Sequence, residues 1–459
     1  MIEHAEGTVF RGRTGRSEPK IGVDEFLSIA ERFGFNAATM GRLRNLLSNE
    51  QLPEGGPNLA RYATARPAPP VGEAFDELAK ETFGVRFARG MSSGTGALHA
   101  AMVAVGAGPG KEMICPAIGF LATSSAAALA GATPVFCDVD ESLHIDPAGI
   151  EPLINERTVA VVPTHYFGGV VDMEEVMAVA RRHGLKVVED CAQSPGASFA
   201  GRPVGSIGDI GCFSISCYKI IGGGEGGLLT TNDERLFERA MQLAECGGFW
   251  RPNRFAPPRY EGELFVGTNY RMSELEAAVD LVQLRKLPGI VKRTRDVFHR
   301  VAAGLQPRRG IVPQKLNDPE GIVGYTLRFF PETCELAARI LADLRAARIP
   351  AGHRGRSAGP DWHLYRYMFP VAACEGSPIA PGRCPVAEDL FDRCVSVQID
   401  PWWSPEDADA AADVIDRVLG KHCEADADAP GWLRARRMET NTAHCNSGRP
   451  ERKMVTWTQ

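Results

Sequence analysis

The chain has 459 residues, of which 24% are charged and 44% are hydrophobic, and this length and composition indicate a globular protein of about two or three domains. The net charge of −6 provides no basic surface, so we expect no nucleic-acid partner. The 12 cysteines include no CxxC pair, which argues against a disulfide framework or a structural zinc site and favours a reducing, cytoplasmic location.

Residues 1–71 are predicted to form an N-terminal extension and a connection. Apolar residues recur at helical spacing over 23–32 and 39–47. The segment 53–70 is rich in Pro, Gly and Ala, which is typical of an extended connection. The N-terminus has early acidic residues and no apolar segment of the kind found in secretory signals.

From residue 72 onward, short apolar runs alternate with helical patterns. The expected strands lie at 85–91, 113–115, 134–137, 159–163, 186–189, 210–215 and 228–231, and the expected helices lie at 97–105, 121–130, 146–154, 173–183 and 273–287. Such alternation, with strands that are apolar throughout, is typical of a mostly parallel sheet covered on both faces. The uncharged stretch 113–137 contains prolines and glycines and fits this alternation, so we predict no membrane segment.

The pattern changes near residue 290. We predict a large domain over 72–290 and a smaller α+β domain over 291–421. The smaller domain is expected to contain helices at 291–305, 332–347 and 405–419 and a strand at 324–330. The polar residues 422–459 are predicted to form a tail.

The segment 208–231 contains a lone lysine, Lys219, between an apolar run and a glycine-rich turn at 222–227. Burial lowers the pKa of a lysine, and the neutral amine can then form a Schiff base with an aldehyde cofactor. A surface lysine after a strand is an equally good interpretation of this segment alone. The run 222–227 also matches GxGxxG, but a dinucleotide-binding motif opens a helix and this run precedes a strand. A close backbone approach therefore explains the glycines better.

Ligands of open α/β sheets bind beyond the carboxyl ends of the strands, where several polar residues are expected. Ser93, Gly94 and Thr95 start a helix, and their N–H groups and hydroxyls suit a phosphate, although a plain helix N-cap is the more common explanation. Asp190 ends a strand and Gln193 follows it. A carboxylate there can keep a pyridinium nitrogen protonated and an amide can bond a phenolic oxygen, but an aspartate that caps a turn is equally common.

Two further positions are weaker candidates. Phe120 follows the strand at 113–115, where an aromatic ring can cover a flat cofactor, although a core phenylalanine is more frequent. Ser214, shortly before Lys219, is either a second phosphate ligand or a solvated strand residue. Together, a phosphate site, a strand-end acid, an aromatic cover and a lysine are the parts that pyridoxal phosphate requires.

Longer stretches carry a resemblance to a known family. They read SSGTGALHAAM, GATPVFCDVD, HGLKVVEDCAQSPGA, GRPVGSIGDIGCFSISCYKIIGGGEGG and GTNYRMSELEAA. Over about residues 72–420 the chain resembles the DegT/StrS-type family of pyridoxal phosphate-dependent sugar and aminocyclitol aminotransferases. This resemblance implies the aspartate aminotransferase-like α/β fold (PLP fold type I), with a large mixed, mostly parallel-sheet domain and a smaller C-terminal α+β domain.

The resemblance also implies roles for single residues. It implies that Lys219 binds pyridoxal phosphate as a Schiff base and later moves protons. It places Asp190 at the ring nitrogen, Gln193 near the ring hydroxyl and Phe120 against the ring. The implied phosphate contacts are Gly94, Thr95 and Ser214. Asn269 matches an asparagine that enters the neighbouring subunit's phosphate site, which implies a homodimer with shared active sites.

The implied activity is transfer of an amino group from glutamate or glutamine to a keto sugar or keto-cyclitol, in secondary-metabolite or glycan biosynthesis. Two alternatives stay open: a related enzyme that uses the Schiff base for elimination or cyclisation, and a non-catalytic regulatory homologue. Tyr218, directly before the lysine, departs from the family pattern. The segment 249–265 departs from it as well; its three arginines either recognise an acidic substrate or belong to a surface loop.

Overall fold

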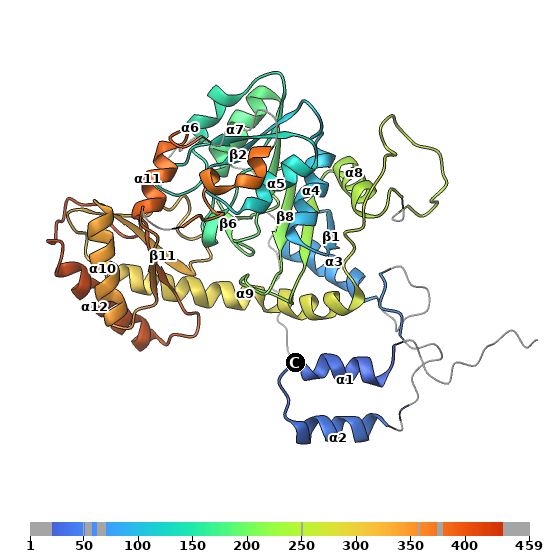
Figure 1. Ribbon diagram of the computed structural model, residues 1–459, viewed down its shortest axis with the longest axis horizontal. Coiled ribbons are helices and arrows are strands. Elements are labelled where there is room, and N and C mark those ends of the chain that lie inside the picture. Colours follow the sequence, from blue (N-terminus) through green and yellow to red (C-terminus); the bar gives the residue numbers. More distant parts are fainter. Residues whose placement is uncertain are drawn as a thin grey trace, which may run out of the picture.

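A seven-stranded sheet forms the centre of the molecule in the computed structural model, which describes residues 21–48, 50, 57–61, 70–248, 251–356, 359–373 and 380–434 (Figure 1). In spatial order its strands are β1 (Phe87–Met91), β9 (Gly227–Thr231), β8 (Ile210–Ser214), β5 (Lys186–Asp190), β4 (Thr158–Val161), β2 (Glu112–Pro116) and β3 (Thr133–Cys137). The pairs from β8 through β3 are parallel, and β9 is antiparallel to both β8 and β1. The prediction of a mixed, mostly parallel sheet is therefore confirmed.

This topology brings the carboxyl ends of six strands to one edge. Since β9 runs against both of its neighbours, β1 has the same direction as β8, and β8 has the direction of β5, β4, β2 and β3. The segments that leave these strands start at the same edge, and β9 begins there. Residues far apart in the sequence thus meet where ligands of α/β sheets bind.

Helices cover both faces of this sheet and bury its strands on both sides. Side chains of β2, β4 and β5 alternate between two buried clusters, one with Ile114, Val161 and Val187 and the other with Met113 and Val188. The first cluster includes residues of α3 (Val71–Phe83), α7 (Met173–His183) and α9 (Glu274–Ala303). The second includes residues of α4 (Gly94–Ala104), α5 (Leu121–Leu129) and α8 (Glu234–Ala244).

The helix α9 corrects one prediction. Two helices were expected, over 273–287 and 291–305, with a break at Pro288, whereas α9 is continuous from Glu274 to Ala303. A proline inside a helix removes one hydrogen bond and costs about 3 kcal/mol. The buried side chains of Leu284, Leu287 and Val291 on either side of it offset that cost. Figure 1 shows α9 running from α3 to α12 (Pro405–Gly420), and the predicted domain limit at 290 lies inside it.

The C-terminal part is built on an antiparallel sheet. Its order is β10 (Ile311–Pro313), β11 (Thr326–Pro331), β13 (Val395–Gln398) and β12 (Ala351–His353), and α10 (Cys334–Ala346), α11 (Pro385–Arg393) and α12 accompany it. The expected polar tail differs from the structure over 422–434. There Trp432 is buried and donates from Nε1 to the carbonyl of Gln306 at 3.0 Å. The other limits, at 71 and 421, stay predictions.

The remaining elements are short or lie in the N-terminal segment. They are α1 (Val23–Glu31), α2 (Ala37–Leu47), α6 (Pro147–Ile150), the strand pair β6 (Ser198–Phe199) and β7 (Arg202–Pro203), and 3₁₀ turns at Glu151–Leu153, Tyr166–Gly168, Tyr365–Tyr367 and Phe369–Ala373. An ion pair of 2.8 Å between Arg44 and Asp24 joins α2 to α1. Over the described ranges, no helix combines the length and the apolar character needed to cross a membrane.

Candidate active site

Lys219 lies on the turn that connects β8 to β9. Backbone hydrogen bonds close this turn, from Cys217 to Gly224 at 2.9 Å, from Gly223 to Ile215 at 3.0 Å and from Lys219 itself to Ser216 at 3.0 Å. The lysine is half-buried, and this burial lowers its pKa below the usual 10.5, while the negative charge of Asp190 acts in the opposite direction. The side chain therefore has an increased fraction of neutral amine and lies within electrostatic reach of Asp190.

Asp190 ends β5 and is buried. Its Oδ2 accepts a hydrogen bond of 2.5 Å from Thr123 Oγ1, and its Oδ1 accepts one of 3.0 Å from the backbone of Ala192. Thr123 comes from the first turn of α5, which follows β2, so segments at the ends of β5 and β2, on either side of β4, fix this carboxylate. Its orientation is set by donors within the chain, and its charge acts on Lys219.

Gln193 is fixed by two residues, Phe167 and Tyr325, for which the sequence predicted no role in the site. Its side-chain oxygen accepts from the backbone N–H of Phe167 at 3.0 Å, and its carbonyl accepts from the hydroxyl of Tyr325 at 2.9 Å. Because the amide oxygen is used, the amide NH₂ is the group that can donate to a ligand. Phe167 has φ 45° and ψ 48°, a left-handed conformation that is costly for a residue with a side chain and that concentrates at functional sites.

The start of α4 packs directly on the strands that flank Lys219. Ser93 is the N-cap, and its hydroxyl accepts from Gly96 at 3.0 Å. A Cβ on Gly94 would lie 2.7 Å from Cβ of Ser214, and a Cβ on Gly227 would lie 2.3 Å from the Ser93 carbonyl, so both close approaches require glycine.

This packing leaves donors at the start of α4. In the described chain no acceptor takes the N–H groups of Gly94 and Thr95. Ser214 packs against Gly94, and the positive end of the helix dipole adds to the attraction for an anion. The arrangement provides the donors that a phosphate needs.

Phe120 and His363 form an aromatic wall. Phe120 precedes α5 and remains 40% exposed, so it is not the core residue of the alternative interpretation. The ring centroid of His363 lies 5.4 Å from that of Phe120 and 5.7 Å from that of Phe167. Backbone bonds from Gly119 to His363 at 3.0 Å and from Tyr365 to Ala117 at 2.9 Å hold this distant segment in place.

Asn269, Tyr218 and the segment 249–265 lie apart from these contacts. Asn269 is exposed, and its side chain accepts from the backbone of Arg271 at 3.1 Å. Tyr218 is 93% exposed, so its side chain is not part of the packing within this chain. In the described part of the segment, Arg259 forms ion pairs with Glu238 and Glu263, which makes this arginine part of the loop's own structure.

Substituting Gly94 by alanine is expected to weaken binding of phosphate-bearing ligands by about 10-fold or more, because the new methyl group pushes α4 away from Ser214. Titration with pyridoxal phosphate, followed by absorbance, measures the affinity. Gly108→Ala is the matched control, since a Cβ there meets nothing within 4 Å. Equal affinities of the two variants would contradict the importance of this contact.

Comparisons with known proteins agree with this geometry. A model of the DegT/DnrJ/EryC1/StrS aminotransferase family matches residues 69–418. The chain is similar to the UDP-N-acetyl-3-dehydro-alpha-D-glucosamine 3-aminotransferase of Acidithiobacillus ferrooxidans, with 35% identity over 76% of this chain and 88% of that protein. It is also similar to the L-glutamine:2-deoxy-scyllo-inosose aminotransferase of Streptomyces fradiae, with 39% identity over 66% of this chain and 67% of that protein.

Coverage varies among the relatives. The chain spans 56% and 53% of the length of two other curated relatives. Among solved structures, S. venezuelae DesV in complex with a ketimine intermediate matches with a TM-score of 0.65 and 27% identity, over 85% of this chain and 96% of that one. The match across most of that structure agrees with the α/β architecture described above.

Proposed function

The chain belongs to the DegT/DnrJ/EryC1/StrS aminotransferase family, and we propose that it transfers an amino group from glutamate or glutamine to a keto sugar or a keto-cyclitol. Enzymes of this family depend on pyridoxal phosphate. The observation that carries the proposal is the convergence of Lys219, Asp190 and the start of α4 at one edge of the sheet. The names of the relatives support the substrates, since one aminates a nucleotide-linked keto sugar and the other a keto-cyclitol with glutamine.

The described residues fit this cofactor. Over the described ranges, neither the amine of Lys219 nor the N–H groups of Gly94 and Thr95 bond to another residue. The hydroxyl of Thr164, which is buried beside the end of β5, also lacks a partner there. In this proposal Gly94, Thr95 and Ser214 bind the phosphate.

The ring would be held by three further side chains. Phe120 covers it, Asp190 faces its nitrogen and Gln193 donates to its hydroxyl. Phe120 follows β2, and Asp190 and Gln193 lie at or just after the end of β5, a parallel strand of the same sheet on the other side of β4. Such a set, fixed by donors within the chain, orients a planar ligand before any substrate binds.

Pyridoxal phosphate, when bound, supplies an aldehyde that captures amines and a ring that withdraws electrons from the adjacent substrate carbon. Lys219 provides the amine that holds the aldehyde and is the base that moves a proton at the substrate's carbon, which its lowered pKa favours. The charge of Asp190 favours a proton on the ring nitrogen. The hydrogen bonds from Thr123 and Ala192 keep that carboxylate in position.

A spectral experiment tests the function. Purified protein loaded with pyridoxal phosphate should be yellow, and addition of glutamine or glutamate should convert the spectrum to that of the aminated cofactor. A keto sugar or keto-cyclitol should then restore the first spectrum. A protein that binds the cofactor but reacts with no amino acid would exclude transamination and favour elimination or cyclisation. A protein that binds no cofactor would overturn the proposal. The remaining hypothesis would then be a non-catalytic regulatory homologue.

The proposal includes a homodimer located in the cytoplasm. The exposed Asn269 and the apolar side chains of Leu275, Val279 and Val282, exposed along one side of α9, support a second copy of the chain as the neighbour of this surface. Ten described cysteines are free thiols, which suits a reducing compartment. Sedimentation of the purified chain tests the assembly, and a monomer at micromolar concentration would contradict it.

A further inference from the structure

Arg328 on β11 is a buried arginine that lacks an acidic partner. It is 6% exposed, and burial of a guanidinium is costly unless an acceptor compensates its charge. Throughout the described residues, no carboxylate, carbonyl or hydroxyl accepts a hydrogen bond from its side chain. The charge of Arg328 is therefore available to a ligand.

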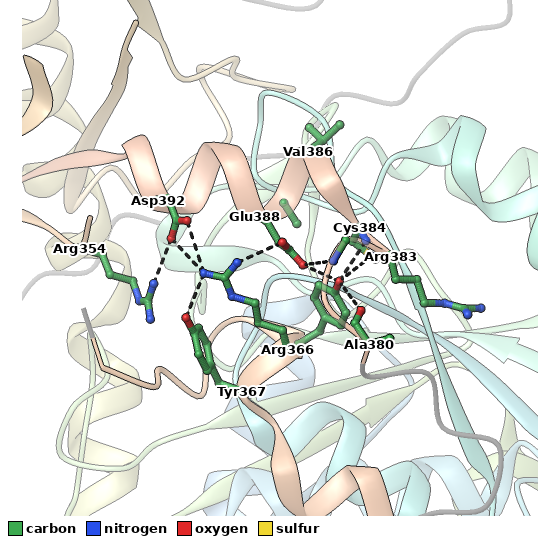
Figure 2. Close-up of polar contacts among 12 residues, drawn as sticks. Arg354, Arg366, Tyr367, Ala380, Arg383, Cys384, Val386, Glu388 and Asp392 are labelled. Atoms are coloured by element: carbon green, nitrogen blue, oxygen red, sulfur yellow. Dashed lines mark hydrogen bonds and ion pairs between the residues drawn. The ribbon is translucent and has the colours of Figure 1, made fainter. Parts of the chain in front are cut away.

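Other arginines of the same part of the molecule are paired. Figure 2 shows Arg366 between Glu388 and Asp392, with Arg354 on the other side of Asp392. The Arg366–Glu388 and Arg354–Asp392 distances are both 3.0 Å. Arg308, with a similar burial to that of Arg328, pairs with Asp416 at 2.8 Å. Arg328 differs from this group by its missing acid.

Two aromatic rings hold Arg328 in place. Its guanidinium carbon lies 4.4 Å from the ring centroid of Phe167 and 5.5 Å from that of Tyr166. Such contacts use the flat face of the guanidinium and leave the N–H groups at its edge free to bind a planar anion. The aromatic contacts thus orient the side chain without neutralising it.

The neighbours that feel the charge of Arg328 are themselves neutral. Burial lowers the pKa of His144 to about 3 and raises the pKa of Cys394 to about 11. Burial also raises the pKa of Tyr166 and Tyr325 above the usual value of tyrosine. Two acids act on these neighbours, Asp140 on His144 and Asp361 on Tyr166, and both are already paired, with Lys315 at 2.5 Å and with His363 at 2.9 Å.

Arg328 is coupled to the candidate active site through Phe167. The backbone of Phe167 donates to the side chain of Gln193, and its ring lies beside His363. Tyr325, also near the start of β11, donates to the carbonyl of Gln193. Arg328 therefore belongs to the side of the site that Gln193, Phe167 and His363 form.

We infer that Arg328 binds the α-carboxylate of the amino donor, an inference that rests on the function proposed above. A guanidinium edge matches a carboxylate through two parallel hydrogen bonds, and no other common side chain does so. Every amino acid donor carries such a carboxylate, whereas a keto-cyclitol carries none. The missing acidic partner of Arg328 is then supplied by the substrate.

The test compares Arg328→Met and Arg328→Lys with the wild type, each loaded with pyridoxal phosphate. Spectral titration with glutamine should show that the half-saturating concentration of glutamine rises on the order of 100-fold in Arg328→Met. The rise should be smaller in Arg328→Lys, because lysine keeps the positive charge but lacks the two parallel N–H groups of the guanidinium. The cofactor spectrum should stay unchanged in both. A second readout is the melting temperature, which glutarate should raise in the wild type and not in Arg328→Met.

Arg366→Met is the matched control, because it removes a partly buried arginine that has its own acids. It should leave the glutamine titration unchanged. A folded Arg328→Met variant with wild-type glutamine saturation would overturn the inference, as would an effect confined to the keto acceptor. If the wild type reacts with no amino acid, the proposed function fails, and an equal glutarate response of wild type and variant would separately overturn the role of Arg328.

Discussion

Replacing Lys219 by alanine is expected to abolish covalent attachment of pyridoxal phosphate and to lower kcat by at least about 10³-fold. The variant loses the amine that holds the aldehyde and the base that moves the substrate's proton. Reduction with borohydride followed by mass spectrometry of the peptides should find the cofactor on Lys219 in the wild type and on no lysine in the variant. Absorbance should show that the variant is no longer yellow.

The control is Lys111→Ala, which removes an exposed lysine directly before β2. This variant should keep the labelled peptide, the colour and the activity. Label on a lysine other than Lys219 in the wild type would contradict the assignment. Full activity of the folded Lys219→Ala variant would contradict it equally, because the fold alone supplies no base.

The pH dependence follows from the burial of Lys219. Its pKa is lowered below 10.5, so the neutral amine appears at lower pH than it would in water. The rate of the proton-transfer step should therefore rise with pH and level off before pH 10.5 is reached. Stopped-flow absorbance with a saturating amino donor measures this profile, and a midpoint at or above 10.5 would show that burial does not activate the lysine.

The sequence contained enough information to predict the sheet and most of the candidate site residues, because the strands of such a sheet have a characteristic apolar pattern. In a doubly covered parallel sheet each strand is apolar throughout, so strand ends stand out as the points where polar residues return. Asp190, Ser214 and Ser93 are such points, and the structure brings them to one edge. Position 94 requires glycine because α4 packs closely on Ser214 and leaves no space there for a side chain.

The residues that the sequence missed come from outside this pattern. Phe167 has an unusual backbone conformation with no glycine to indicate it. Arg328 and His363 lie more than a hundred residues beyond Gln193, and they reach the site only because the C-terminal part packs against the large sheet. Periodicity within one segment contains no information on such contacts. An arginine among the apolar residues of an expected strand was the one available signal for Arg328.

The continuity of α9 shows the same limit. Pro288 predicts a helix boundary from local chemistry, and the local cost is real. The helix nevertheless continues through Pro288, because leucines and a valine on both sides of the proline are buried. This burial depends on elements that lie far away in the sequence. Tertiary packing therefore outweighs a local preference of a few kcal/mol.

The second large effect is expected for Asp190→Asn, which should lower kcat by about 10²- to 10³-fold while the cofactor stays bound. The amide keeps the shape of the side chain and can still bond Thr123 and Ala192, so the change is mainly the loss of one negative charge. A neutral group no longer favours a proton on the ring nitrogen, and the electron withdrawal that the reaction needs becomes weaker. Single-turnover rates with glutamine measure the loss.

The same substitution should also move the pH profile, which separates an electrostatic role from a structural one. Asp190 raises the pKa of Lys219, so its neutralisation should lower that pKa further and shift the rate profile to lower pH. Asp209→Asn is the control, because Asp209 pairs with Lys186 at 2.9 Å at the opposite end of β5. It should cost stability and leave the profile in place. A folded Asp190→Asn variant with the wild-type rate and profile would show that this carboxylate acts on neither the cofactor nor the lysine.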